Sequence, residues 1–180
     1  MSLRSVSAGL AGALTAAVLL SGSAALAAGS SPAPSTPAKC STLKANSAEW
    51  KKCMASNQGS LTNEDLYAAG YSLAKSGDYQ GALQFLTAGT DKKDPRFLTM
   101  IGYSTRKLGK VDEGMGYYMQ ALAIDPNSVT TREYLGEAYL QKKDLTGAKA
   151  QLMEIQNRCG VSCESFTELN EQIARYQTGL

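Results

Sequence analysis

The stretch REYLGEAYLQKKDLTGAK at residues 132–149 decides the fold of this chain, because two earlier stretches match it. These are LYAAGYSLAKSGDYQGAL at 66–83 and LTMIGYSTRKLGKVDEGM at 98–115. Aligned glycines stand 32 and 34 residues apart, at Gly70, Gly102 and Gly136. A fixed period of this length is typical of repeat architectures, in which each unit buries its apolar face against the next.

Each unit also carries a second small residue twelve positions after its glycine, at Ala82, Gly114 and Ala148. Small residues facing each other let two antiparallel helices approach closely. We therefore predict one helix pair per unit, with each glycine opposite its small partner. Larger apolar residues should fill the layer between units, and we expect them at Leu66, Leu73, Leu86, Leu98, Ile101, Tyr118, Leu135, Tyr139 and Leu152.

Capping residues mark the expected helix ends. Thr62 and Asp65 have the spacing of a capping box. The dipeptide at 94–95, Asp-Pro, places a capping acceptor before a proline at the first helical position. The Asp-Pro dipeptide at 125–126 should stop the helix before it.

The pattern resembles the tetratricopeptide repeat (TPR) family over residues 62–162. The residues that carry the resemblance are YLGEAY at 134–139 with Ala148, and Tyr118, Ala121 and Pro126. The resemblance implies an all-α, right-handed solenoid of about three helix pairs, at 63–94, 95–128 and 129–162. Ile155 departs from the family, which usually has a small residue there, and the first unit is two residues short. More narrowly, the chain resembles small periplasmic TPR proteins of alphaproteobacteria. This resemblance supports the fold and the compartment, and it does not point to a particular biochemical activity.

A repeat array needs a cap that covers its last apolar face. Residues 163–177 can supply this cap as a helix, because one stripe of that helix carries Phe166, Leu169, Ile173 and Tyr176. Gly160 should break the preceding helix, between two cysteines that could fasten the cap to the last repeat.

The N-terminal region has the features of an export signal. Arg4 precedes an apolar run at 10–20, and Ala-Leu-Ala at 25–27 fits signal peptidase, so we predict a signal peptide at 1–27. The run is too short to cross a bilayer, which takes about 20 apolar residues. We expect a flexible linker at 28–38, a Cys-bounded segment with Trp50 at 39–60, the TPR domain at 61–180, and location in the periplasm without a membrane span.

Four cysteines in an exported chain favour disulfides, and four allow three pairings. We predict Cys40 with Cys53 and Cys159 with Cys163, because each pair lies within one short segment. A four-thiolate zinc site is the alternative, but such sites usually space their cysteines by two to four residues. The C-x3-C spacing at 159–163 also differs from thioredoxin-type redox sites.

Composition narrows the functional classes. The 180-residue chain has no histidine, which excludes the usual general base and His-ligated zinc. Its formal net charge of +2 offers no basic excess for nucleic acid. Glu133 and Glu137 could form a carboxylate pair, but ordinary surface charge explains them better. We expect no catalysis, cofactor or metal.

The expected binding surface is the concave face, which in the resembled family is formed by the first helix of each pair. Its candidates are Tyr67, Tyr71, Lys75, Thr99, Tyr103, Arg106, Lys107, Glu133, Glu137 and Gln141. Aromatic residues and arginine dominate binding hot spots. The alternative is a solvated face with half-packed tyrosines. We predict a protein–protein interaction module of the cell envelope that holds a protein or peptide segment, and the rival hypothesis is a carrier of a small apolar ligand or lipid.

Overall fold

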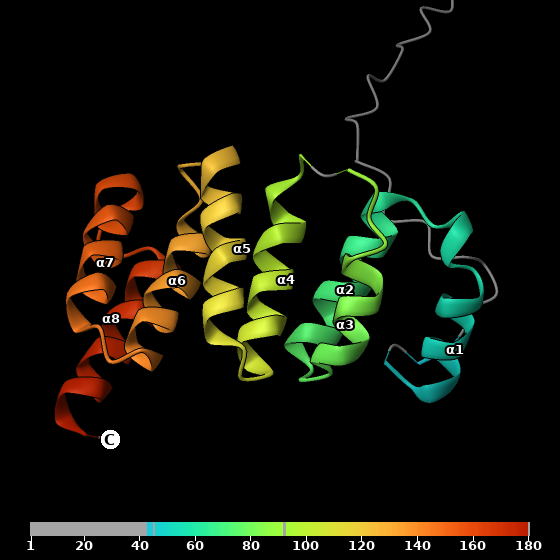
Figure 1. The fold of residues 1–180 in the computed structure, drawn as a ribbon, viewed down its shortest axis with the longest axis horizontal. Coiled ribbons are helices and arrows are strands. Elements are labelled where there is room, and N and C mark those ends of the chain that lie inside the picture. Colours follow the sequence, from blue (N-terminus) through green and yellow to red (C-terminus); the bar gives the residue numbers. More distant parts are fainter. Residues whose placement is uncertain (1–42, 45, 92, 180) are drawn as a thin grey trace, which may run out of the picture. The chain divides into compact units, whose positions relative to one another are not determined.

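The fold is all-α in the part of the chain that the computed structural model describes, residues 43–179 apart from 45 and 92 (Figure 1). The helices are α1 Ala48–Ser56, α2 Asn63–Lys75, α3 Tyr79–Leu86, α4 Pro95–Lys107, α5 Val111–Ile124, α6 Val129–Gln141, α7 Leu145–Cys159 and α8 Glu164–Thr178, with a 3-10 turn η1 at Gln58–Ser60. These residues contain no strand, so the predicted fold class is confirmed. The predicted signal peptide and linker, together with Cys40, lie outside the described residues.

The helices pack as consecutive pairs. Helices α2 and α3, α4 and α5, and α6 and α7 contact each other most extensively. Each pair also contacts the next through α3 with α4 and α5 with α6, and the first helices α2, α4 and α6 contact one another in series. This arrangement is an α-solenoid of helix pairs, as predicted. None of the described helices is both long and apolar enough to cross a bilayer.

The predicted capping residues occupy the helix ends. Thr62 and Asp65 form a capping box at the start of α2. Asp94 caps α4 and Pro95 is its first residue. Helix α5 ends at Ile124, and Asp125 is its C-cap.

The turn inside each pair uses a left-handed backbone at the same aligned position. Gly77 has φ 88° and Gly109 has φ 89°, a conformation that glycine adopts without steric cost. The third pair has Lys143 at this position with φ 62°. A lysine with positive φ is strained relative to glycine.

The close approach predicted at the glycines holds in the first two pairs. A Cβ atom added to Gly102 would lie 2.9 Å from the Gly114 carbonyl oxygen, and one added to Gly70 would lie 3.2 Å from the Ala82 carbonyl oxygen. The third pair differs. A Cβ atom on Gly136 would lie 2.5 Å from a methyl carbon of Leu169 in α8. Gly136 therefore makes room for the last helix, and its approach to Ala148 stays a prediction.

Two glycines in α5 should respond in opposite ways to alanine. A Cβ atom on Gly114 would lie 2.8 Å from the Gly102 carbonyl oxygen, whereas Gly116 has no such neighbour within 4 Å. We expect Gly114→Ala to destabilise the fold by about 1–3 kcal/mol through overpacking. Gly116→Ala should instead stabilise it by about 0.5–1 kcal/mol, because glycine is the poorer helix former. Urea unfolding of both variants measures the difference.

The core forms two clusters of buried side chains. The larger runs from Trp50 in α1 to Ala138 in α6. The smaller joins Leu140, α7 and α8. Six of the nine predicted layer residues are buried, namely Leu66, Leu73, Leu86, Ile101, Tyr118 and Leu135. The other three, Leu98, Tyr139 and Leu152, are half-buried and therefore lie at the edge of the core instead of inside it. Tyr139 packs against both clusters.

The two ends of the array are covered differently. Helix α1 packs Trp50 against Phe85, with ring centroids 6.2 Å apart, and Lys51 pairs with Asp78. At the other end, α8 contacts α6 and α7. Its Leu169 and Ile173 are buried, Phe166 is half-buried, and Tyr176 lies at the surface.

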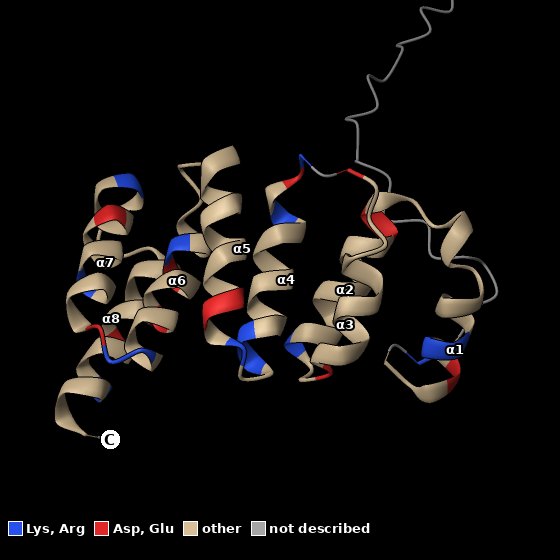
Figure 2. Cartoon of the chain, viewed as in Figure 1, with Lys and Arg blue, Asp and Glu red and all other residues tan. Residues whose placement is uncertain are grey.

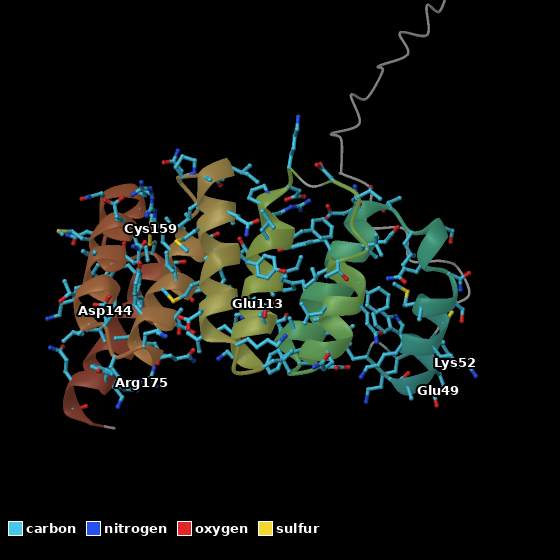
Figure 3. The ribbon with its side chains drawn as sticks, in the orientation of Figure 1. Glu49, Lys52, Glu113, Asp144, Cys159 and Arg175 are labelled. Carbon is cyan, nitrogen blue, oxygen red and sulfur yellow. A yellow bond between two sulfur atoms is a disulfide. The ribbon has the colours of Figure 1, made fainter. Side chains whose placement is uncertain are left out.

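A disulfide joins Cys159 at the end of α7 to Cys163 at the N-cap of α8, as predicted (Figure 3). It closes the turn before the cap helix. Cys53 in α1 is disulfide-bonded as well. Its predicted partner, Cys40, lies outside the described residues.

Candidate functional site

A polar groove of about 330 Å³ lies along the first helices of the three pairs and reaches α8. Six of the ten residues proposed for the binding surface line it: Tyr71, Lys75, Tyr103, Lys107, Glu133 and Glu137. Five further residues complete the lining, and sequence reasoning did not select them: Thr130, Tyr134, Glu164, Ser165 and Glu168.

The first two pairs contribute the same two side chains to the groove. Tyr71 and Lys75 on α2, and Tyr103 and Lys107 on α4, are each four residues apart, a spacing that places both on one helix face. The third pair has Glu137 and Gln141 at the aligned positions. The groove therefore changes from basic to acidic between α4 and α6.

Tyr103 is the aromatic centre of the groove. Its ring centroid lies 4.8 Å from that of Tyr134 and 6.1 Å from that of Tyr79. The ammonium groups of Lys75 and Lys107 lie 5.7 and 5.4 Å from the same ring. Cations at this distance are attracted to an aromatic ring. Burial raises the pKa of Tyr103, so it is a neutral phenol near neutral pH.

Arg106, which the sequence predicted for the binding surface, does not line this groove. Its side chain is only 1% exposed. The guanidinium donates to Glu137 Oε2 at 2.5 Å and to the Tyr118 hydroxyl oxygen at 3.2 Å. Helices α4 and α5 approach closely here, because a Cβ atom on Gly114 would lie 2.9 Å from the Cβ atom of Arg106. The two bonds of the guanidinium join α4 to α5 and α6, and Arg106 also lines a neighbouring hollow beside α8.

Three other candidates also lie outside the groove lining. Tyr67 packs edge-on against Phe97 with centroids 5.6 Å apart, under the guanidinium of Arg96. Thr99 is buried and its hydroxyl shares a hydrogen bond of 2.7 Å with that of Thr131. Gln141 lines a neighbouring hollow beside α8.

The acidic half of the groove centres on Glu133, which is 9% exposed. Burial, which is the largest cause, together with repulsion from Glu137 and Glu168 raises its pKa to about 7. A hydrogen bond with Ser165 and the charge of Lys75 oppose the shift. Glu164, Ser165 and Glu168 all come from α8, so the cap helix forms part of the groove wall. The i, i+4 spacing of Glu164 and Glu168 could have indicated a shared face, although not which surface it meets.

Glu133 should make stability depend on pH. Its pKa is raised from 4.5 to about 7 in the folded protein, so the folded state binds this proton more tightly than the unfolded state. That contribution is present below pH 4.5 and is lost as the pH rises through 7. We expect Glu133→Gln to raise the free energy of unfolding by about 1–2 kcal/mol at pH 8, with a smaller gain at pH 5. Urea midpoints at both pH values test this, and an equal gain at each would contradict it.

A second hollow, of about 550 Å³, lies over α3, α4 and α5 and has a more apolar lining. Among its residues are Leu86, Phe97, Leu98, Ile101, Tyr117 and Ile124. None of the groove candidates lines it. Within the described residues, no group of three or more His, Cys, Asp or Glu side chains is arranged to hold a metal ion.

Comparisons with known proteins agree with this architecture. A family model described as tetratricopeptide repeat matches residues 95–128. No curated protein matches the sequence. The Yersinia enterocolitica type III secretion chaperone SycD, solved with a peptide of the translocator YopD, has 24% identity and a TM-score of 0.54. That match covers 64% of this chain and 89% of SycD.

Two further solved structures have the same fold. PcrH, solved with the chaperone-binding region of PopD, has 20% identity and a TM-score of 0.55 over 64% of this chain and 91% of PcrH. PcrH comes from Pseudomonas aeruginosa. The first TPR domain of human RPAP3 has 18% identity and a TM-score of 0.58 over 66% of this chain and 94% of that domain.

Stacked antiparallel helix pairs with a groove along their first helices define an α-solenoid repeat protein. The family match at 95–128, which spans α4 and α5, specifies the kind of repeat. Residues 95–128 of this chain match the tetratricopeptide repeat, and the neighbouring helix pairs share its fold.

Proposed function

We propose that this protein is a non-catalytic interaction module that binds a peptide or protein segment in the groove of Tyr71, Tyr103 and Tyr134. The observation that carries this proposal is the groove itself, which combines three aromatic rings with charged groups of both signs. Aromatic side chains of this kind give a peptide large contact areas at low entropic cost. SycD and PcrH, which have this fold, were solved with segments of their partner proteins.

We propose further that the chain is exported and works in the cell envelope, in the periplasm of its host. The predicted signal peptide at 1–27 motivates this location. The Cys159–Cys163 disulfide supports it, because disulfides persist in oxidising compartments.

Binding at the groove should depend on Tyr71. This side chain is 41% exposed, so Tyr71→Ala should change the free energy of unfolding by no more than about 0.5 kcal/mol. Affinity for groove-binding peptides, selected from a random library displayed on phage, should fall at least tenfold. Met119, on α5 and 56% exposed, gives the matched control Met119→Ala, which should bind as the parent does. Full affinity in Tyr71→Ala would move the binding surface elsewhere.

The second candidate function is that of a carrier. The hollow over α3, α4 and α5 favours it, because its apolar lining suits a small apolar ligand or lipid. Organic extraction of the protein purified from its native host, followed by mass spectrometry, distinguishes the carrier from the interaction module. A stoichiometric lipid or metabolite supports the carrier. A co-purifying polypeptide supports the interaction module.

A further inference from the structure

The charges in the groove are separated by sign. Lys75 and Lys107 come from the first two pairs, whereas Glu133 comes from the third and Glu164 and Glu168 from α8. All five side chains line one hollow of about 330 Å³. Its two halves can therefore be reached by a single short segment of a ligand.

These five groups make no ion pair with one another in the described part of the chain, nor with any other described side chain. Elsewhere on the described surface, opposite charges form ion pairs, as in Lys142 with Asp112 and Arg158 with Glu154. Both signs are spread along the helices (Figure 2). The groove is thus a place where ammonium and carboxylate groups lie close but keep their pairing capacity.

Burial sharpens this asymmetry. Glu133 is 9% exposed and is held by Ser165 of α8, so its carboxylate is fixed in the wall instead of moving freely in water. The lysines are exposed and lie over the Tyr103 ring. Charges fixed around aromatic surface favour a partner of complementary charge and disfavour others by repulsion.

We propose that the groove selects peptide segments carrying both an acidic and a basic side chain. The acidic group is held by Lys75 and Lys107, and the basic group by Glu133 and Glu168. This inference rests on the proposed function, peptide binding in the groove, and adds the charge pattern of the partner. A purely acidic segment meets Glu133, Glu164 and Glu168, and a purely basic one meets the two lysines. A segment with one charge of each sign satisfies both halves.

The test uses a random twelve-residue peptide library displayed on phage and selected on the full-length chain. Peptides of both charge signs should be enriched. Synthetic copies should bind at least tenfold more tightly than versions whose acidic or basic residues are replaced by Ser. Their affinity should fall between 0.05 and 0.5 M NaCl because exposed charges are screened.

Two charge variants make the assignment specific. Lys75→Glu with Lys107→Glu should weaken binding of the selected peptides about tenfold or more and shift a new selection toward basic peptides. Glu168→Lys should shift it toward acidic peptides. The matched controls Lys149→Glu and Glu49→Lys change exposed residues outside the groove lining and should leave the selection unchanged.

The possible results distinguish failure of the proposed charge pattern from failure of peptide binding in the groove. If the selected peptides need Tyr71 but show no charge preference, the proposed charge pattern is wrong and binding in the groove still holds. The same conclusion follows if the charge preference is unchanged in both charge variants. A library that yields no peptide sensitive to Tyr71→Ala overturns groove binding and the charge pattern with it.

Discussion

An Arg106→Glu variant is expected to lose about 3–5 kcal/mol of unfolding free energy, a large part of the stability of an ordinary domain. The substitution removes the bonds from the guanidinium to Glu137 and to the Tyr118 hydroxyl. It also places a second carboxylate beside Glu137 where the side chain is 1% exposed. A buried charge without a partner is costly, and two like charges are worse. Guanidinium chloride unfolding followed by circular dichroism measures the loss.

The neighbouring residue provides the control for Arg106. Lys107 is exposed and lines the groove, so Lys107→Glu makes the same change of charge one position along α4. Its unfolding free energy should stay within about 0.5 kcal/mol of the parent. Equal stability of the two variants would mean that Arg106 is not anchored in the seam between α4 and α5.

The contrast between Arg106 and Lys107 illustrates what sequence could and could not predict. The repeat period placed both residues on the first helix of the second pair, and that helix is present as α4. Neighbours in a helix point about 100° apart, so two adjacent residues can lie in different surroundings. Which residue faces the groove depends on the packing of α5, where the Tyr118 hydroxyl accepts a hydrogen bond from Arg106. The pattern of cationic residues alone does not contain this information.

The fold was predictable for a different reason. Helix ends depend on local capping, as at Thr62 with Asp65, and helix pairs depend on small residues at a fixed spacing, as at Gly102 with Gly114. Both signals lie within short stretches of sequence. The groove, in contrast, joins residues from α2 to α8, almost a hundred positions apart. The part that α8 supplies, with Glu164, Ser165 and Glu168, requires knowing how the cap helix docks.

The docking of α8 gives the second large expected effect. A chain that stops after Ser162 should lose more than about 5 kcal/mol of unfolding free energy, or aggregate. The truncation removes Leu169 and Ile173 and uncovers Ala148 and Ile155, which are 0% exposed. Loss of a single large buried side chain already costs about 2–5 kcal/mol. Repeat arrays whose last apolar face is bare are poorly soluble. Solubility on expression and thermal unfolding measure the effect.

Two controls separate the packing of α8 from its covalent attachment and from chain length. Cys159→Ser with Cys163→Ser keeps α8 and opens the short loop, which should cost about 2 kcal/mol in the chain-entropy model. A chain that stops after Arg175 removes only the exposed end of α8, including Tyr176, and should unfold like the parent. If the chain that stops after Ser162 loses no more unfolding free energy than the variant without the disulfide, α8 contributes little burial. In that case packing does not hold Ser165 and Glu168 in the groove lining. A much larger loss in the truncated chain makes the cap helix both the closing layer of the core and the support of the acidic half of the binding site.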